Sequence, residues 1–197
     1  MNLGGMCAMA ARYSDRYDEY VKGTGEGGAF EEEALHWFHL FRDAMNEAYF
    51  EISRSRLHPE RRVETTLPAD RRIDLAQVEP PVCSVSGVYR ADGTTDVEFQ
   101  YVNRYEIRVT GARAGETVIV AYQYLPDRLE KEEDEPIFPE SLADPMVYVS
   151  LAVARVWQSE RKYAAAQPWL TAYYQKLREL RPVSAPRRRT LRRPLFR

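Results

Sequence analysis

Cysteine and histidine are scarce in this chain of 197 residues, which has only Cys7, Cys83 and three histidines. Two isolated cysteines supply neither a disulfide framework nor a zinc site. Residues 6–11 are apolar, but no basic region precedes them and the run is too short for a signal peptide. No window has the length of an apolar membrane span. We therefore expect a protein of the reducing cytoplasm that does not enter a membrane.

The motifs of nucleophilic catalysis are also missing, because the chain has no G-x-S-x-G pattern and no convincing Cys–His arrangement. Residues 23–28 match G-x-G-x-x-G, but a dinucleotide site needs a preceding strand and a helix N-terminus free to hold phosphate. Residues 16–22 are polar and helix-like, and Glu31, Glu32 and Glu33 would repel a pyrophosphate. We interpret residues 23–28 as a glycine hinge.

Metal ligands are few. His36 and His39 are three residues apart on one predicted helix, but Trp37, Phe38 and Phe41 surround them and no second ligand cluster exists, so we expect core or interface histidines. The acidic stretch 130–135 lacks the glycine and the alternating ligands of an EF-hand loop, which favours a solvated loop. We predict no catalytic residues, no cofactor and no metal, and therefore a protein that is not an enzyme.

Charge is present but unevenly distributed. Residues 182–197 hold six arginines and no acid, whereas the whole chain has a net charge of −2, so the body carries −8. An acidic body with a basic arm suggests that the arm binds something negative. Aromatic residues make up 12% of the chain, with 13 tyrosines, which is a mild indication of large protein interfaces.

Helical periodicity occurs at both ends of the chain. A first helix is predicted over 6–22, and a long one over 30–57, where apolar residues recur three and four apart and Pro59 stops the helix. Residues 145–181 predict a helical hairpin, with its turn between Gln158 and Pro168 and with Pro168 separating the two helices.

Between these helices the apolar period changes to two. Residues 63–125 predict one small antiparallel sheet. Val82–Arg90 and Thr95–Val102 flank an Asp92-Gly93 turn, which predicts a hairpin with positive φ at both central positions. A second turn at 111–115 leads to a last strand over 117–124. The expected class is α+β: a helical bundle with an inserted antiparallel sheet and an extended basic tail. The expected parts are 1–28 (helix and hinge), 29–181 and 182–197.

Three stretches together resemble the head-to-tail connector (adaptor, neck) proteins of tailed bacteriophages. Residues 44–54, with the pattern Asn46-x-Ala48, resemble an early helix of that family. Residues 105–111 and 117–126 resemble its strand pair ending in "Tyr…Pro". Residues 134–139, Asp-x-Pro-x-x-Pro, resemble its approach to the last helical hairpin. The similarity spans about residues 30–180, while the N-terminal helix and the arginine-rich tail depart from the family.

The resemblance implies a structural virion protein: a homo-oligomeric ring of about twelve copies, closed by one repeated heterologous interface. Such a ring binds the portal protein on one side and a downstream neck or tail protein on the other. DNA passes through its channel without sequence-specific binding, which suits the acidic body. The protein would lie in the virion, between capsid and tail, after assembly in the host cytoplasm.

The tail has three interpretations. It binds an acidic protein groove, it binds nucleic-acid phosphates as the arm of a nucleic-acid-binding protein, or it is an inert solubilising segment. The apolar residues at its end favour protein docking, and the resemblance makes the portal the partner. The candidate binding residues are Arg187, Arg188, Arg189, Leu191, Arg192, Arg193, Leu195, Phe196 and Arg197.

Overall fold

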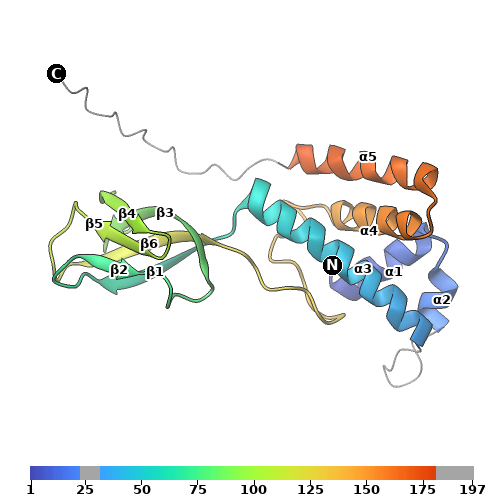
Figure 1. Cartoon of the computed structure of the whole chain (residues 1–197), viewed down its shortest axis with the longest axis horizontal. Helices are drawn as coiled ribbons and strands as arrows, with labels where there is room; N and C mark the ends of the chain where they lie inside the picture. Colours follow the sequence, from blue (N-terminus) through green and yellow to red (C-terminus); the bar gives the residue numbers. More distant parts are fainter. Residues whose placement is uncertain (23–31, 181–197) are drawn as a thin grey trace. The chain divides into compact units, whose positions relative to one another are not determined.

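The computed structural model describes residues 1–22 and 32–180, and it contains helices and strands in two separate units (Figure 1). One unit, here called the helical unit, combines residues 1–57 with residues 126–180. The other, here called the β unit, is His58–Leu125. The chain therefore leaves the helical unit once, builds the β unit from a continuous stretch, and returns. The protein has an α+β fold, as the sequence predicts.

The helical unit is built around one buried helix. Its elements are α1 (Leu3–Tyr13), α2 (Tyr17–Lys22), α3 (Glu32–Ile52), the π-helix η1 (Ser53–Leu57), α4 (Met146–Ser159) and α5 (Tyr163–Glu179). Helix α4 packs against α1, α3 and α5, and its side chains from Val147 to Ala154 are all buried. Because α4 is covered on most sides, this stretch is apolar apart from Tyr148 and Ser150.

The prediction of one helix over 6–22 is wrong, because the chain breaks between α1 and α2. Asp15 has a φ of 57°, which ends the helical conformation. The Ser14 hydroxyl donates to the Ala10 carbonyl at 2.8 Å and closes the last turn of α1. Helix α1 also begins earlier than predicted, since the Asn2 side chain accepts the Gly5 amide at 3.0 Å as an N-cap.

The long predicted helix is confirmed from Glu32 onward, whereas its predicted start at residue 30 lies outside the described residues. Its last five residues are not α-helical: Ser53–Leu57 form a single π turn. The buried Ser53 hydroxyl donates to the Tyr49 carbonyl at 2.7 Å at this transition. His58 follows with a φ of 38°, one residue before the predicted stop at Pro59.

The predicted C-terminal helical hairpin is confirmed, with its turn at residues 160–162. Arg161 has a φ of 61°, and the Lys162 amide donates to the Trp157 carbonyl at 2.8 Å. Pro168 does not separate the helices but lies inside α5. Proline removes one amide from the helix. It is tolerated here because Ala164, whose carbonyl loses that donor, is exposed and can be solvated.

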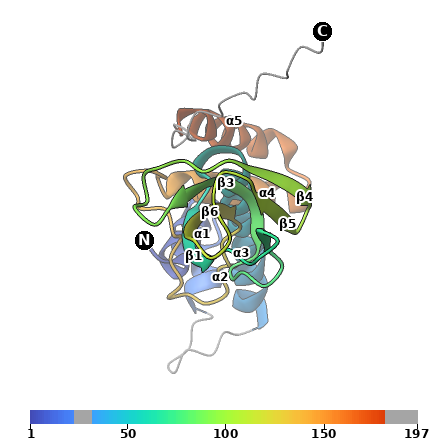
Figure 2. The same ribbon diagram turned by 90° about the vertical axis from the view of Figure 1, so that its left-hand side faces the viewer.

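The β unit has two antiparallel three-stranded sheets rather than the single sheet predicted. Its strands are β1 (Glu60–Thr66), β2 (Arg72–Asp74), β3 (Val82–Arg90), β4 (Phe99–Asn103), β5 (Glu106–Val109) and β6 (Thr117–Tyr124). The strand orders are β1-β6-β3 and β2-β5-β4, and all of these strands except β2 are labelled in Figure 2. Side chains from both sheets share one core around Val88, Ile107 and Val118.

The turn at Asp92-Gly93 forms, but the hairpin that it was expected to close is short. Only Gly93 has a positive φ, at 72°, so the prediction of positive φ at both positions is wrong. The arms stay paired only through Arg90 with Thr95, the Tyr89–Asp96 bridge and Val88 with Val97. Strand β3 then pairs with β6, and β4 pairs with β5. Alternation alone does not distinguish one sheet from two, because both bury every second residue.

Candidate protein-interaction surfaces

The predicted binding residues, Arg187 to Arg197, and the predicted hinge at 23–28 lie outside the described residues. The site must therefore be sought in the helical unit and the β unit as described. Neither His36 nor His39 is in the core, as both are exposed on α3. Within residues 1–22 and 32–180, no group of three or more His, Cys, Asp or Glu side chains could hold a metal ion.

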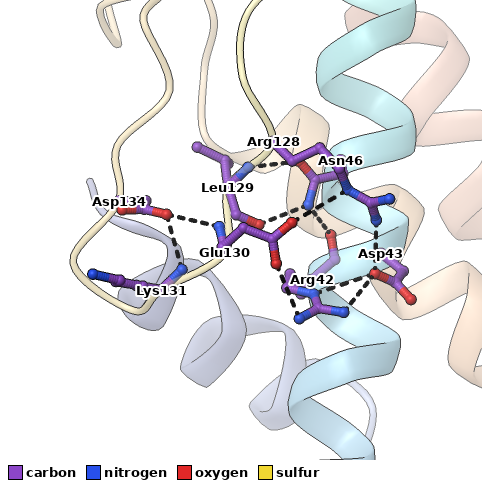
Figure 3. A network of polar contacts seen from close by, with 8 residues as sticks. All are labelled: Arg42, Asp43, Asn46, Arg128, Leu129, Glu130, Lys131 and Asp134. Atoms are coloured by element: carbon purple, nitrogen blue, oxygen red, sulfur yellow. Dashed lines mark hydrogen bonds and ion pairs between the residues drawn. The ribbon is translucent and has the colours of Figure 1, made fainter.

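The acidic loop between β6 and α4 is anchored to α3 through Asn46. The Asn46 Nδ2 donates to the Leu129 carbonyl at 2.9 Å, and the Leu129 amide donates to Asn46 Oδ1 at 2.9 Å (Figure 3). Asn46 is only 2% exposed, and Leu129 is buried beside it. An unpaired buried amide or carbonyl is costly, so this two-way bond fixes the loop's path. Residues 130–135 themselves form a loop in which Glu130, Lys131, Glu133 and Glu135 are exposed, in keeping with the predicted solvated loop.

Further along, the loop folds back on itself and on α1. The Asp134 carboxylate accepts the amides of Glu130 and Lys131 at 2.7 and 2.8 Å, and these bonds hold its pKa below the usual value. The amides of Leu3 and Gly4 donate to the carbonyls of Asp134 and Glu132. Together these four bonds hold the backbone of the loop in place, and Figure 3 shows the two that Asp134 accepts.

Surface ion pairs surround this anchor. Arg42 lies 3.4 Å from Glu130, and both Arg42 and Arg128 lie 3.1 Å from Asp43 (Figure 3). The carboxylates are about half exposed, and exposed pairs typically contribute only about 0–1 kcal/mol each. The buried amide bonds at Asn46, rather than these pairs, decide where the loop lies.

A second charged cluster joins the α1–α2 corner to the α4–α5 turn. Arg16 forms ion pairs with Glu160 and with Glu19, and its guanidinium lies 5.1 Å from the Trp37 ring centre. Hydrogen bonds from Lys162 and Arg16 lower the pKa of Glu160. A carboxylate stabilised in its charged form by two cations is a poor proton acceptor. The cluster is suited to a structural role, in which it holds the α1–α2 corner against the α4–α5 turn.

Buried phenols and one thiol show the strongest pKa changes. Burial raises the pKa of Cys7, Tyr20, Tyr148 and Tyr173. The Tyr173 hydroxyl donates to Glu51 at 2.5 Å between α5 and α3. These groups face the core of the helical unit, where they pack helices together.

Helix α5 carries the most distinctive exposed surface of the helical unit. No charged residue occurs between Lys162 and Lys176, although this stretch spans more than three turns. Tyr163 is 65% exposed and Tyr174 is 51% exposed. The other exposed residues of this uncharged face are Ala164, Ala165, Gln167, Pro168, Thr171 and Gln175. Depletion of charge with enrichment of tyrosine is typical of protein–protein interfaces.

No protein-family model matches the chain, and no curated protein matches its sequence. The assignment of function therefore depends on the residues and surfaces themselves. Within the described ranges, no helix is both long enough and apolar enough to cross a bilayer.

The β unit has an exposed aromatic edge of its own. Strand β4 ends its sheet, and Tyr101, Val102 and Tyr105 in and after it are each about half exposed. The Tyr101 hydroxyl accepts the Val85 amide at 2.7 Å, so this ring is fixed rather than free to turn away. An edge strand with fixed aromatic side chains can pair with or pack on another chain.

Sequence reasoning missed the α5 face and the role of Asn46. The signals were present: thirteen consecutive residues without charge, 163–175, and a polar amide within the apolar stripe of α3. The apolar periodicity of the α5 stretch indicates one buried face and leaves the opposite face undefined.

Proposed function

We propose that this protein is a non-enzymatic structural subunit of a tailed-phage neck, where copies form a ring beneath the portal and connect head to tail. Within each subunit, the helical unit would be a bundle, the β unit would be a sheet domain inserted into it, and residues 182–197 would be an extended basic arm. The ring of about twelve copies would surround the channel through which DNA passes. It would assemble in the host cytoplasm.

The observation that carries the proposal is the bond between two of the motifs on which the resemblance depends. The Ile137 amide of the Asp134-x-Pro-x-x-Pro139 motif donates to the hydroxyl of Tyr49, which belongs to the α3 motif at 44–54, at 3.0 Å. Asn46, in the same α3 motif, is bonded to Leu129 at the start of the loop that leads to residues 134–139. Asp134 in turn caps that loop. The contact between Tyr49 and Ile137 joins residues 88 apart in the chain and helps to hold the segment that precedes the α4–α5 hairpin.

The uncharged α5 face supports the proposal of side-by-side assembly. A closed ring needs a heterologous interface, in which one face of a subunit meets a different face of the next. The exposed tyrosines Tyr163 and Tyr174 give α5 large contact area with few rotatable bonds. We assign this face to the contact with a neighbouring copy.

The charge distribution supports the two remaining contacts. Residues 127–140 hold seven acids and two bases, a net charge of −5, and such a surface repels DNA phosphates instead of retaining them. The arginines at 187–189, 192, 193 and 197, together with Leu191, Leu195 and Phe196, would bind the portal. The other side of the ring would meet the downstream neck or tail protein.

The decisive experiment measures the mass of the full chain alone and after mixing with the portal protein encoded in the same genome. Native mass spectrometry and electron microscopy should show a ring of this chain on the portal. A protein that remains monomeric with the portal present, without any annular complex, contradicts the proposal.

Removal of residues 182–197 tests the arm. The shortened chain should keep its circular dichroism spectrum and lose portal binding. Binding to DNA by the full chain, weakening steeply with salt in proportion to the arginines engaged, would instead support the nucleic-acid-binding alternative.

A further inference from the structure

A cavity of about 210 Å³ lies in the helical unit, where the acidic loop reaches α4. Its apolar wall includes Met6, Phe138, Pro139, Ala143 and Pro145. For comparison, an apolar cavity of about 150 Å³ in another protein is large enough to bind benzene. The space therefore has the size and the lining for one aromatic ring.

The polar groups at this cavity indicate which chemical groups should flank a bound aromatic side chain. Tyr148 also lines the cavity and is only 1% exposed, yet its hydroxyl has no hydrogen-bond partner among the described residues. Two acids, Glu135 and Glu140, belong to the same lining. Glu140 is paired with the Met1 amine at 2.6 Å, and the exposed Glu135 also attracts that amine. The cavity thus offers an exposed acid and a buried hydroxyl beside its apolar wall.

The C-terminal arm begins close to this cavity. Lys176, in the last turn of α5, pairs with Asp144 at 2.6 Å, and the next residue, Pro145, lines the cavity. Leu180, the last described residue before the arm, is buried in the core of the same unit. About 15 residues separate Leu180 from Leu195, which gives a maximum reach of about 50 Å. The arm is therefore long enough to return to the cavity.

The end of the arm has the matching chemistry. Phe196 is the only aromatic residue in 181–197, and the basic residues Arg193 and Arg197 lie on either side of it. We propose that the cavity is the docking site of the chain's own C-terminal end, with the Phe196 ring inside it and a flanking arginine beside Glu135. An aromatic anchor in an apolar pocket, with opposite charges at the rim, follows the usual division of binding energy in protein interfaces.

Docking of the arm in the cavity would limit its availability for binding to the portal. The docking itself requires only one chain, whereas this effect on portal binding rests on the proposed function. An arm end held in the cavity is withheld from the portal, so a portal must compete for it. The free subunit would then bind weakly until many portal sites are presented together in a ring.

Disulfide trapping in the full chain tests the docking. The variant carries Ser141→Cys beside the cavity residue Glu140 and Leu195→Cys in the arm, with the exposed Cys83 changed to Ser and the buried Cys7 retained. Mild oxidation of a dilute sample should give an intrachain disulfide. Adding Phe196→Ala should slow its formation about tenfold, which corresponds to about 1.4 kcal/mol.

Matched variants separate docking from random collision. Glu135→Lys should slow trapping as Phe196→Ala does, whereas Glu133→Lys, an equally exposed acid outside the cavity lining, should slow it much less. Circular dichroism confirms that each variant folds. An unchanged rate with Phe196→Ala overturns the proposal, and so does trapping mainly between chains, which would make a second copy the occupant. Neither result depends on a portal, so failure here is distinct from failure of the proposed function.

Discussion

Asn46 and Leu129 are hydrogen-bonded to each other in both directions across 83 residues of chain, through one buried side-chain amide and one backbone peptide. The pair fixes the loop that precedes α4, and α4 is the helix around which the helical unit packs. A single pair of buried hydrogen bonds thus fixes the path of the chain between β6 and α4.

Replacement of Asn46 by Ala should destabilise the helical unit by about 2–3 kcal/mol, because the Leu129 amide and carbonyl both lose a buried partner. Urea unfolding followed by tryptophan fluorescence measures this, since Trp37, Trp157 and Trp169 all lie in the helical unit. The control Gln175→Ala removes an exposed amide and should cost under about 0.5 kcal/mol. Equal stability of the two variants would mean that the loop is held by other contacts.

Alkaline pH should weaken the fold before the buried tyrosines ionise. Burial raises the pKa of Tyr20, Tyr148 and Tyr173, whereas in the unfolded chain phenols ionise near pH 10. Above that pH the folded state binds more protons than the unfolded state, so stability falls as pH rises and is fully retained below it.

Absorbance at 295 nm, recorded beside far-ultraviolet circular dichroism, follows these phenols. We expect part of the tyrosine signal to appear only as the protein unfolds, and Tyr173→Phe should reduce that late part. Complete ionisation near pH 10 by a protein that keeps its helical spectrum is incompatible with this prediction.

The turn after β3 depends on Asp92. Its carboxylate accepts the amides of Thr94 and Thr95, both at 2.8 Å, and the Thr95 hydroxyl at 2.7 Å, and these bonds lower its pKa. Asp92→Ala should therefore speed hydrogen exchange at the two threonine amides, which nuclear magnetic resonance resolves residue by residue. Asp96→Ala, an exposed acid in the same connection, is the control. Unaltered exchange would show that Gly93 alone maintains the turn.

The assignment of the α5 face to the ring contact predicts that Tyr174→Glu prevents assembly on the portal. A charge placed in an uncharged interface must be desolvated, so ring formation should fall at least about tenfold. Leu35→Glu is the control, since Leu35 on α3 is 38% exposed and lies outside both the α5 face and the β4 edge. Mass photometry with the portal measures both. Rings of Tyr174→Glu at wild-type yield would exclude this face from the contact.

Several elements were predictable because their causes are local. The apolar stripe of α3, the change to alternation after residue 60 and the turns at Gly93 and Gly115 depend on neighbours within a few positions. The break at Asp15 is local too, but it was missed because aspartate only sometimes adopts a positive φ. The expectation that Pro168 separates the two helices was wrong, because a helix tolerates proline where the freed carbonyl is exposed to water.

The sequence by itself determined the α+β class, the order of helices and strands, and the separation of acidic body from basic arm, since these depend on periodicity and composition. Only the tertiary structure decided the division of the strands into two sheets, the bond from Asn46 to Leu129, the exposed side of α5 and the cavity beside Tyr148. These features arise where segments distant in the chain meet. The free energy of such contacts depends on geometry and burial, and neither is encoded in the spacing of residues along one segment.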